Sequence, residues 1–208
     1  MRSEPPVLRA GLAVLLLVPV AVLAAFVSAG WEPMRAFDRG VTARLHEVAH
    51  DVPALTTVMT WLTNLFQPNV FRLAALVLVI WLARHGARRT ATWVAVTMIA
   101  GGVLGGLLKL LFGRGRPEFL DPVSSAVGYA FPSGHALNSA MAVTIAVILF
   151  PRWWALWLIP LLTALSRVYL GVHWTSDVVA GLLLGAAVPL LTARAFVPAR
   201  AAVPVNQL

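Results

Sequence analysis

The chain has 208 residues, which favours a single domain over residues 1–208. Hydrophobic residues make up 60% of it and charged residues 12%, whereas soluble domains are about 45–50% apolar and about 25% charged. This composition excludes an ordinary soluble protein and favours a polytopic membrane protein. The net charge of +8 would suggest nucleic acid in a soluble domain, but the basic residues form no stripe. We therefore expect membrane lipids with anionic head groups as partners, and no nucleic acid.

Six apolar segments can cross a hydrocarbon core of about 30 Å, which takes roughly 20 helical residues. They are predicted over Leu8–Ala29, Val70–Ala83, Thr92–Phe112, Ser133–Phe150, Trp153–Leu170 and Trp174–Phe196. The second is expected to begin earlier, within Thr57–Phe66 or just after it. The predicted fold class is all-α, a membrane bundle of six transmembrane helices. Val27-Ser28-Ala29 loosely suits a signal peptidase, but the first segment exceeds the usual signal length, so we expect an uncleaved helix.

Basic residues in short loops predict the orientation of the bundle. With six spans, one side receives all of the following: Arg2, Arg9, Arg84, Arg88, Arg89, Arg152, Arg194 and Arg200. That side is predicted to be cytoplasmic, in a plasma membrane of bacterial type. The opposite side receives the Gly30–Phe66 linker, the Gly113–Pro132 loop and the Gly171–Val172 turn.

The linker over residues 31–66 is too polar to cross a membrane. Phe37, Val41, Leu45 and Val48 have the spacing of an amphipathic helix on the membrane surface, and a solvated connection is the alternative. We read His46, His50 and His85 as solvated loop residues. No metal-ligand spacing is apparent in this reading, so neither a metal nor another cofactor is expected.

Three charged residues lie within or beside apolar segments, on the predicted non-cytoplasmic side. Lys109 is the one lysine of the chain and lies in the third segment, Arg167 ends the fifth, and Asp177 lies in the sixth. A charge at the centre of a membrane helix costs about 2.5–3.5 kcal/mol on insertion scales, and less near the ends. Residues retained at such a cost are candidates for function.

Three motifs bring further polar residues to the same side. They are Lys109-Leu-Leu-Phe-Gly-Arg-Gly-Arg116-Pro117, Pro132-Ser133-Gly134-His135 and Ser166-Arg167-Val-Tyr-Leu-Gly-Val-His173-Trp-Thr-Ser-Asp177. Together they resemble the three-part signature of the type 2 phosphatidic acid phosphatase family, whose site is shared with vanadium haloperoxidases. All signature positions are filled, in order and with the family spacing, over residues 109–177.

Phosphoryl transfer spreads negative charge over the equatorial oxygens, so its catalysis relies on positioning and fixed cations. Lys109, Arg116 and Arg167 would supply three cations. Ser133 and Gly134 open the fourth segment, where free backbone N–H groups can bind an anion. The resemblance implies the same phosphate-binding roles for these five residues.

His173 and Asp177 are four residues apart, which places them on one face of a helix. A carboxylate bound to one imidazole nitrogen leaves the other free to attack. The resemblance implies that His173 attacks phosphorus to form a phosphohistidine. It also implies that His135 protonates the leaving oxygen and later helps to activate water.

Each of these residues also has a plain structural reading. Ser133 alone suits a helix cap, Lys109 alone could extend to the interface, and Asp177 could form a structural pair with His173 or Arg167. The prediction of a functional site fails only if all of these structural interpretations are correct at the same time. Arg114 lies outside the signature and is expected to serve the loop or a head group, and Glu118 and Asp121 are expected to be solvated.

The leading hypothesis is hydrolysis of a lipid phosphate monoester, or of a polyprenyl or other lipid pyrophosphate, without a metal. Two alternatives remain: a transporter of lipids or anions that performs no hydrolysis, since charges inside membranes also mark transport paths, and a vanadium haloperoxidase. The size and hydrophobicity of the chain disfavour the latter. The sequence leaves open which lipid is the substrate and which oligomeric state forms.

Overall fold

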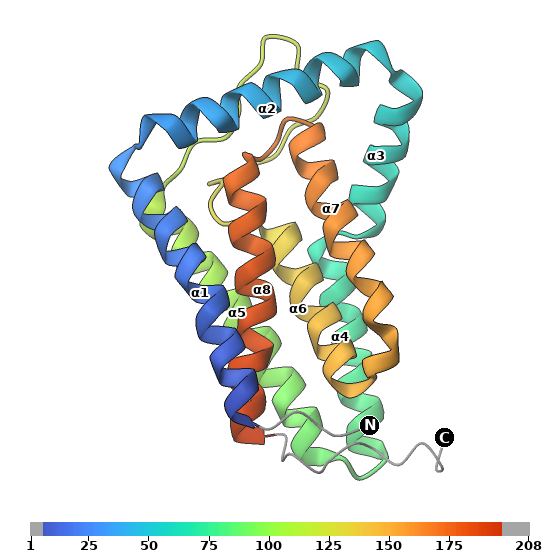
Figure 1. The fold of residues 1–208 in the computed structure, drawn as a ribbon. Coiled ribbons are helices and arrows are strands. Elements are labelled where there is room, and N and C mark those ends of the chain that lie inside the picture. The colour runs from blue at the N-terminus through green and yellow to red at the C-terminus, as the bar shows by residue number, and fades with distance from the viewer. Residues whose placement is uncertain (1–5, 197–208) are drawn as a thin grey trace.

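The computed structural model describes residues 6–196, and all regular structure within them is helical. The helices in chain order are α1 (Pro6–Ala29), α2 (Glu32–Asp51), α3 (Pro53–Leu65), α4 (Pro68–Arg84), α5 (Arg88–Phe112), α6 (Gly134–Leu149), the 3-10 helix η1 (Pro151–Trp157), α7 (Leu158–Tyr169) and α8 (Thr175–Phe196). All except α2 run along the bundle, and α2 crosses one end of it (Figure 1). The all-α membrane bundle predicted from the sequence is confirmed.

Four helical stretches in this part of the chain are long and apolar enough to span a membrane: Gly11–Ala29, Pro53–Arg84, Arg88–Phe112 and Thr175–Phe196. The second combines α3 and α4, so it begins before Val70, as the sequence suggested. The other two predicted passages are shorter, because α6 has 16 residues and α7 has 12 residues preceded by η1. The predicted number of six spans is therefore an approximate description of this bundle.

The connections separate into two groups along the bundle (Figure 1). The α4–α5 connection, the α6–η1 connection and the end of α8 lie at one end. Helix α2, the long α5–α6 loop and the α7–α8 turn lie at the other. The two groups agree with the predicted grouping of the loops, while the assignment of one end to the cytoplasm stays a prediction. Two of the basic residues on which that assignment rests, Arg2 and Arg200, lie outside the described residues.

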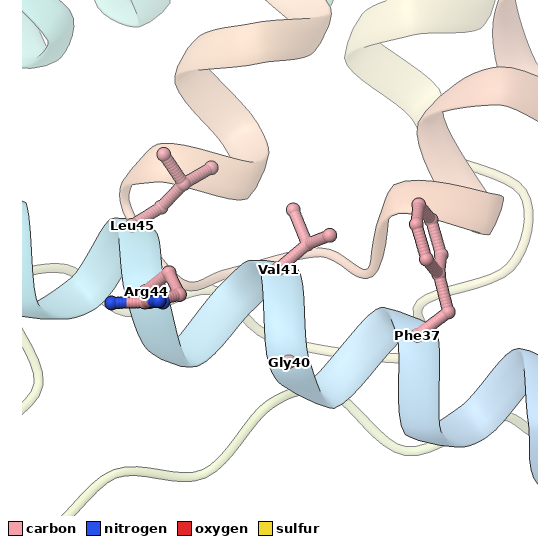
Figure 2. Close-up of a pocket in the computed structure, with 5 residues that line it drawn as sticks. All are labelled: Phe37, Gly40, Val41, Arg44 and Leu45. Atoms are coloured by element: carbon pink, nitrogen blue, oxygen red, sulfur yellow. The ribbon is translucent and has the colours of Figure 1, made fainter.

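The linker forms helix α2, so the helical alternative for this segment is confirmed. Figure 2 shows Phe37, Val41 and Leu45 along one side of α2, where they line a groove of about 480 Å³. Val41 and Leu45 pack against a small apolar cluster contributed by α6, α7 and α8, and Phe37 is 60% exposed. The buried stripe of α2 is a different one, formed by Met34, Asp38, Thr42, His46 and Ala49. Placement on a membrane surface stays a prediction.

Small residues allow α6 and α8 to pack closely, as is common between membrane helices. A Cβ atom added at Gly181 would lie 2.7 Å from the carbonyl oxygen of Ser133, and one at Gly185 would lie 2.5 Å from that of Leu137. Such contacts are too short to be tolerated, so both positions require glycine. The close approach lets the Ser133 amide donate to the Asp177 carbonyl at 3.0 Å. The start of α6 is thereby fixed to the start of α8.

Candidate active site

The predicted site residues come from helices α5, α6, α7 and α8 and their connections, which meet toward the end of the bundle covered by α2 (Figure 1). Lys109 lies in the last turn of α5, and Arg116 follows in the α5–α6 loop. Ser133 precedes α6, which begins with Gly134 and His135. The remaining residues lie around the turn between α7 and α8 and are Arg167, His173 and Asp177.

His173 and Asp177 are both buried, with side chains 2% and 0% exposed. His173 Nδ1 lies 3.4 Å from Asp177 Oδ2, and the same oxygen accepts the Trp174 amide at 2.9 Å. Arg116 Nη1 lies 3.1 Å from His173 Nε2. Because a guanidinium only donates hydrogen bonds, Nε2 must be the acceptor and Nδ1 must carry the proton. The geometry thus favours the tautomer whose free lone pair is on Nε2.

Burial holds the pKa of His173 well below its usual value, and the charges of Arg116, Arg167 and Lys109 lower it further. Desolvation disfavours the imidazolium, and nearby cations repel it. The imidazole is therefore neutral at neutral pH, as a nitrogen nucleophile must be.

The α5–α6 loop holds two of the predicted phosphate-binding cations through its carbonyl groups. Lys109 Nζ donates to the Tyr129 carbonyl at 2.6 Å. Arg116 donates to the Gly128 carbonyl at 2.7 Å and, across the site, to the Val172 carbonyl at 2.6 Å. The loop is closed at its base by the Ala130 amide, which donates to the Arg114 carbonyl at 2.9 Å. These contacts fix both cations near His173, where Arg116 reaches Nε2 and the charges of both lower its pKa.

Two buried polar atoms of the site have no protein partner. Arg167 donates through Nη1 to Thr63 of α3 at 2.9 Å, whereas its Nε makes no hydrogen bond. The Ser133 hydroxyl is also buried without a partner, although Ser133 stands at the N-cap of α6. Buried polar atoms are rarely left unpaired in proteins. Both atoms are therefore suited to a bound anion, and a capping role does not account for Ser133.

Arg114 joins two buried carboxylates, a role that the expected placement in the loop or at a head group did not include. It donates to Asp177 Oδ1 at 2.6 Å and to Asp38 Oδ2 at 2.7 Å. Asp38, on the buried stripe of α2, also accepts the Ser176 amide at 2.9 Å. Asp177 therefore pairs with Arg114, and the suggested pair with Arg167 does not form. This network attaches α2 to the start of α8, next to His173.

The sequence did not predict Asp38 and Thr63, which lie in the linker region and contact Arg114 and Arg167. A weak signal existed for Asp38, since Met34, Asp38, Thr42 and His46 recur every four residues. That stripe lies one residue from the apolar pattern of α2, about 100° around the helix. Thr63 carries no comparable signal.

Two histidines predicted as solvated loop residues lie on helix α2 instead, and of these His46 is buried whereas His50 is exposed as predicted. His46 is buried on α2 and stacks on Phe119 with ring centroids 3.8 Å apart. His50 lies one turn further along, and both approach Asp121, whose pKa is held below its usual value mainly by the hydrogen bond from His46. His85 follows α4 and is exposed, as expected.

A cleft of about 270 Å³ opens beside the site and is lined by Arg35, Asp38, Arg39, Arg114, Gly115, Arg116 and Trp174. Four of these side chains are arginines. The cleft is therefore suited to an anionic group, and Arg116 links it to His173.

The PAP2 superfamily profile matches residues 90–200, which include every predicted site residue. The chain belongs to the PAP2 superfamily. It is 34% identical to an undecaprenyl-diphosphatase of Sulfolobus acidocaldarius over 112 residues, covering 50% of this chain and 54% of that protein. It is 29% identical to undecaprenyl-diphosphatase BcrC of Bacillus subtilis, covering 67% of this chain and 74% of that protein.

A solved structure extends the similarity to most of this PAP2 protein. The crystal structure of a transmembrane PAP2 type phosphatidylglycerolphosphate phosphatase from Bacillus subtilis superposes with a TM-score of 0.76 at 25% identity. The match covers 86% of this chain and 93% of that one. An integral membrane location is thereby supported by a relative as well as by the apolar helices.

Proposed function

We propose that this protein hydrolyses a lipid phosphate or lipid diphosphate through a phosphohistidine on His173. The observation that carries the proposal is the environment of His173 Nε2. Its imidazole is buried and neutral, its other nitrogen faces Asp177, and Arg116 contacts the lone pair that would attack. A phosphate that displaces this guanidinium contact would meet a nucleophile already aligned.

The terminal phosphate would be bound by Lys109, Arg116 and Arg167, with the Ser133 hydroxyl and the amides at Gly134. The unpartnered Arg167 Nε and Ser133 Oγ support these roles, because each needs an acceptor. Amides at the start of α6 add the positive end of a helix dipole. No step requires a metal, because these groups supply the positive charge.

In the first step Nε2 forms a bond to phosphorus while the bond from phosphorus to the leaving oxygen breaks. His135 gives its proton to that oxygen, so the lipid leaves as an alcohol or a monophosphate. The negative charge of the bound substrate neutralises part of the positive charge around His135 and so favours the protonated form of this imidazole. In the second step His135 takes a proton from water, the oxygen of that water attacks phosphorus, the P–N bond breaks and inorganic phosphate leaves.

We propose an isoprenoid diphosphate as the first substrate to examine, because two relatives are named undecaprenyl-diphosphatases. The arginine-lined cleft could hold part of such a head group. Family membership favours hydrolysis over transport without hydrolysis. The distribution of basic residues supports a site at the non-cytoplasmic face of a bacterial-type plasma membrane.

The full chain, purified in detergent, should be tested for phosphate release from undecaprenyl diphosphate, phosphatidylglycerol phosphate and phosphatidic acid. We expect release from at least one of them without added metal, and inhibition by vanadate. His173→Ala should lose this release, and His85→Ala is the matched control at an exposed histidine. A substrate labelled in its terminal phosphate should leave an acid-labile label on the protein that His173→Ala lacks.

Undiminished turnover in His173→Ala would refute the mechanism. Movement of lipid across vesicles without phosphate release, preserved in that variant, would support transport instead. Spheroplasts and inside-out vesicles, given a short-chain substrate that cannot cross membranes, test the face. Hydrolysis by spheroplasts is the expected result, and hydrolysis confined to inside-out vesicles would contradict the proposed orientation.

A further inference from the structure

A second group of histidine and aspartate side chains lies between α2 and the α5–α6 loop. It consists of His46, His50 and Asp121, of which the two histidines are one helical turn apart. The intervening residues complete the sequence His46-Glu47-Val48-Ala49-His50. This H-E-x-x-H pattern places two imidazoles on one face of a helix, as in helical zinc sites. The expectation that the chain has no metal-ligand spacing is therefore wrong.

The three donor groups have the separations of ligands around one ion. His46 Nε2 lies 3.1 Å from Asp121 Oδ1 and 3.2 Å from His50 Nε2, which lies 3.3 Å from Asp121 Oδ2. Ligands around tetrahedral zinc, with bonds of about 2.0–2.1 Å, are about 3.3–3.4 Å apart. The two nitrogens match this separation from each other, and each matches it from one of the two Asp121 carboxylate oxygens. One donor atom from each of the three residues lies within 4.8 Å of the others.

The chemistry of the donors also suits zinc. Two imidazole nitrogens and one carboxylate oxygen suit borderline divalent ions such as zinc. Mg²⁺ and Ca²⁺ suit this set less, because they favour ligands that are all oxygen. The Asp121 side chain is 70% exposed and that of His50 is 42% exposed. An ion can therefore reach the group from solvent, and a fourth position remains open for water.

The group connects two segments that are far apart in the sequence. Its histidines belong to α2, and Asp121 belongs to the loop that holds Lys109 and Arg116 in place. Phe119 of the same loop stacks on His46 and lies beside Gly171, where an added Cβ would be 2.9 Å from the Phe119 ring. A bond between α2 and the loop would therefore restrain the surroundings of the α7–α8 turn.

We infer that His46, His50 and Asp121 bind a zinc ion that fastens the α5–α6 loop to α2. The ion takes no part in phosphoryl transfer, so this inference does not rest on the proposed function. Zinc that binds the folded chain stabilises it by mass action. At a zinc concentration of about one hundred times Kd, Tm should rise by roughly 5–10 °C.

Zinc binding should be measured by calorimetry on the full chain in detergent, after treatment with a chelator and on a tag free of histidine. We expect one ion per chain, and Co²⁺ in its place should give the visible absorption of a nitrogen- and oxygen-bound ion. His50→Ala should weaken zinc binding by more than about tenfold, because even the loss of a partner beyond the ligands costs about 10–100-fold. His85→Ala should bind as the wild type does.

Asp121→Asn provides a second variant at an exposed position, so binding is tested even if His50→Ala folds poorly. Helix content and gel filtration show whether each variant is folded. The inference is overturned if the wild type binds no zinc, or if both folded variants bind as tightly as the wild type. Loss of phosphate release in His173→Ala with zinc binding intact would separate this site from the proposed active site.

Discussion

Two histidine–aspartate groups lie near the same end of the bundle and differ mainly in their exposure to solvent. His173 and Asp177 are buried, whereas the Asp121 side chain that faces His46 and His50 is 70% exposed. An apolar cluster connects the surroundings of the two groups, because Ala49 of α2 packs with Tyr169, Leu170 and Val172.

The difference shows that burial and neighbouring groups determine which chemistry histidine and aspartate side chains can perform. In the buried group, Arg116 and Asp177 specify the tautomer of His173, and burial keeps it neutral. In the open group, two Nε2 atoms and a carboxylate converge where solvent has access. The first arrangement suits attack on phosphorus, and the second suits a metal ion. Four predictions test this contrast.

Replacing the two aspartates should separate the groups most clearly. Asp177→Asn should lower kcat for phosphate release on the order of 10³–10⁴-fold, because an amide no longer holds the required tautomer of His173. Asp121→Asn should change kcat by about twofold or less, because the Asp121 side chain contacts His46 and His50 and none of the predicted phosphate-binding residues. Steady-state kinetics of the two folded variants provide the measurement, and losses of equal size would contradict the contrast.

Removing the arginine that serves the buried group should cost more stability than removing an exposed one. Arg114→Gln leaves Asp38 and Asp177 without their shared cation, so we expect a loss of about 3–5 kcal/mol in unfolding free energy. Arg39→Gln removes an exposed pair with Glu32 and should cost less than about 1 kcal/mol. Thermal unfolding in detergent measures both. Equal Tm values for the two variants would show that the network is not stabilising.

A single methyl group should disturb the helix contact that positions the buried group. Gly181→Ala places a Cβ atom 2.7 Å from the Ser133 carbonyl, so we expect a loss of about 1–3 kcal/mol and reduced phosphate release. Gly102→Ala is the control, because an added Cβ there meets no other atom within 4 Å. Zinc binding should persist in both variants. Wild-type Tm and activity in Gly181→Ala would refute the close approach of α6 and α8.

Lowering the pH should destabilise the fold through the buried His173, and this is the smallest of the four expected effects. The pKa of His173 is lowered in the folded chain from its ordinary value of 6.5. Below pH 6.5 this imidazole is therefore protonated in the unfolded chain but stays neutral in the folded chain. Stability should therefore fall as pH drops below 6.5, by up to about 1.4 kcal/mol per pH unit. The slope of Tm against pH should be shallower in His173→Gln and unchanged in His85→Gln. Identical slopes in the wild type and His173→Gln would contradict burial of a neutral His173.

Most of the fold could be predicted because each spanning segment carries its own signal. A hydrocarbon core requires every backbone polar group to be paired within the segment, so long apolar runs must be helical. The two shorter passages, α6 and η1–α7, depart most from the expected spans. Their lengths reflect Pro151 and the turn before His173, which interrupt the apolar runs.

The signature residues could be chosen because a charge in an apolar run is conspicuous. Lys109 and Asp177 stood out for this reason, and the motif spacing added His135 and His173. Asp38 and Arg114 did not stand out, because polar residues in a polar segment look solvated. Which stripe of α2 is buried depends on the segments that pack on it, and these come from distant parts of the chain.

The sequence by itself determined the helical membrane fold and the residues of the signature, since local hydrophobicity and motif spacing are properties of neighbouring residues. The tertiary structure alone decided the partners of the polar groups. Arg114 reaches Asp38 and Asp177 across 76 and 63 residues, and Asp121 reaches His46 across 75. Such pairings depend on how the helices and the α5–α6 loop pack, because burial and distance arise only when the bundle is assembled.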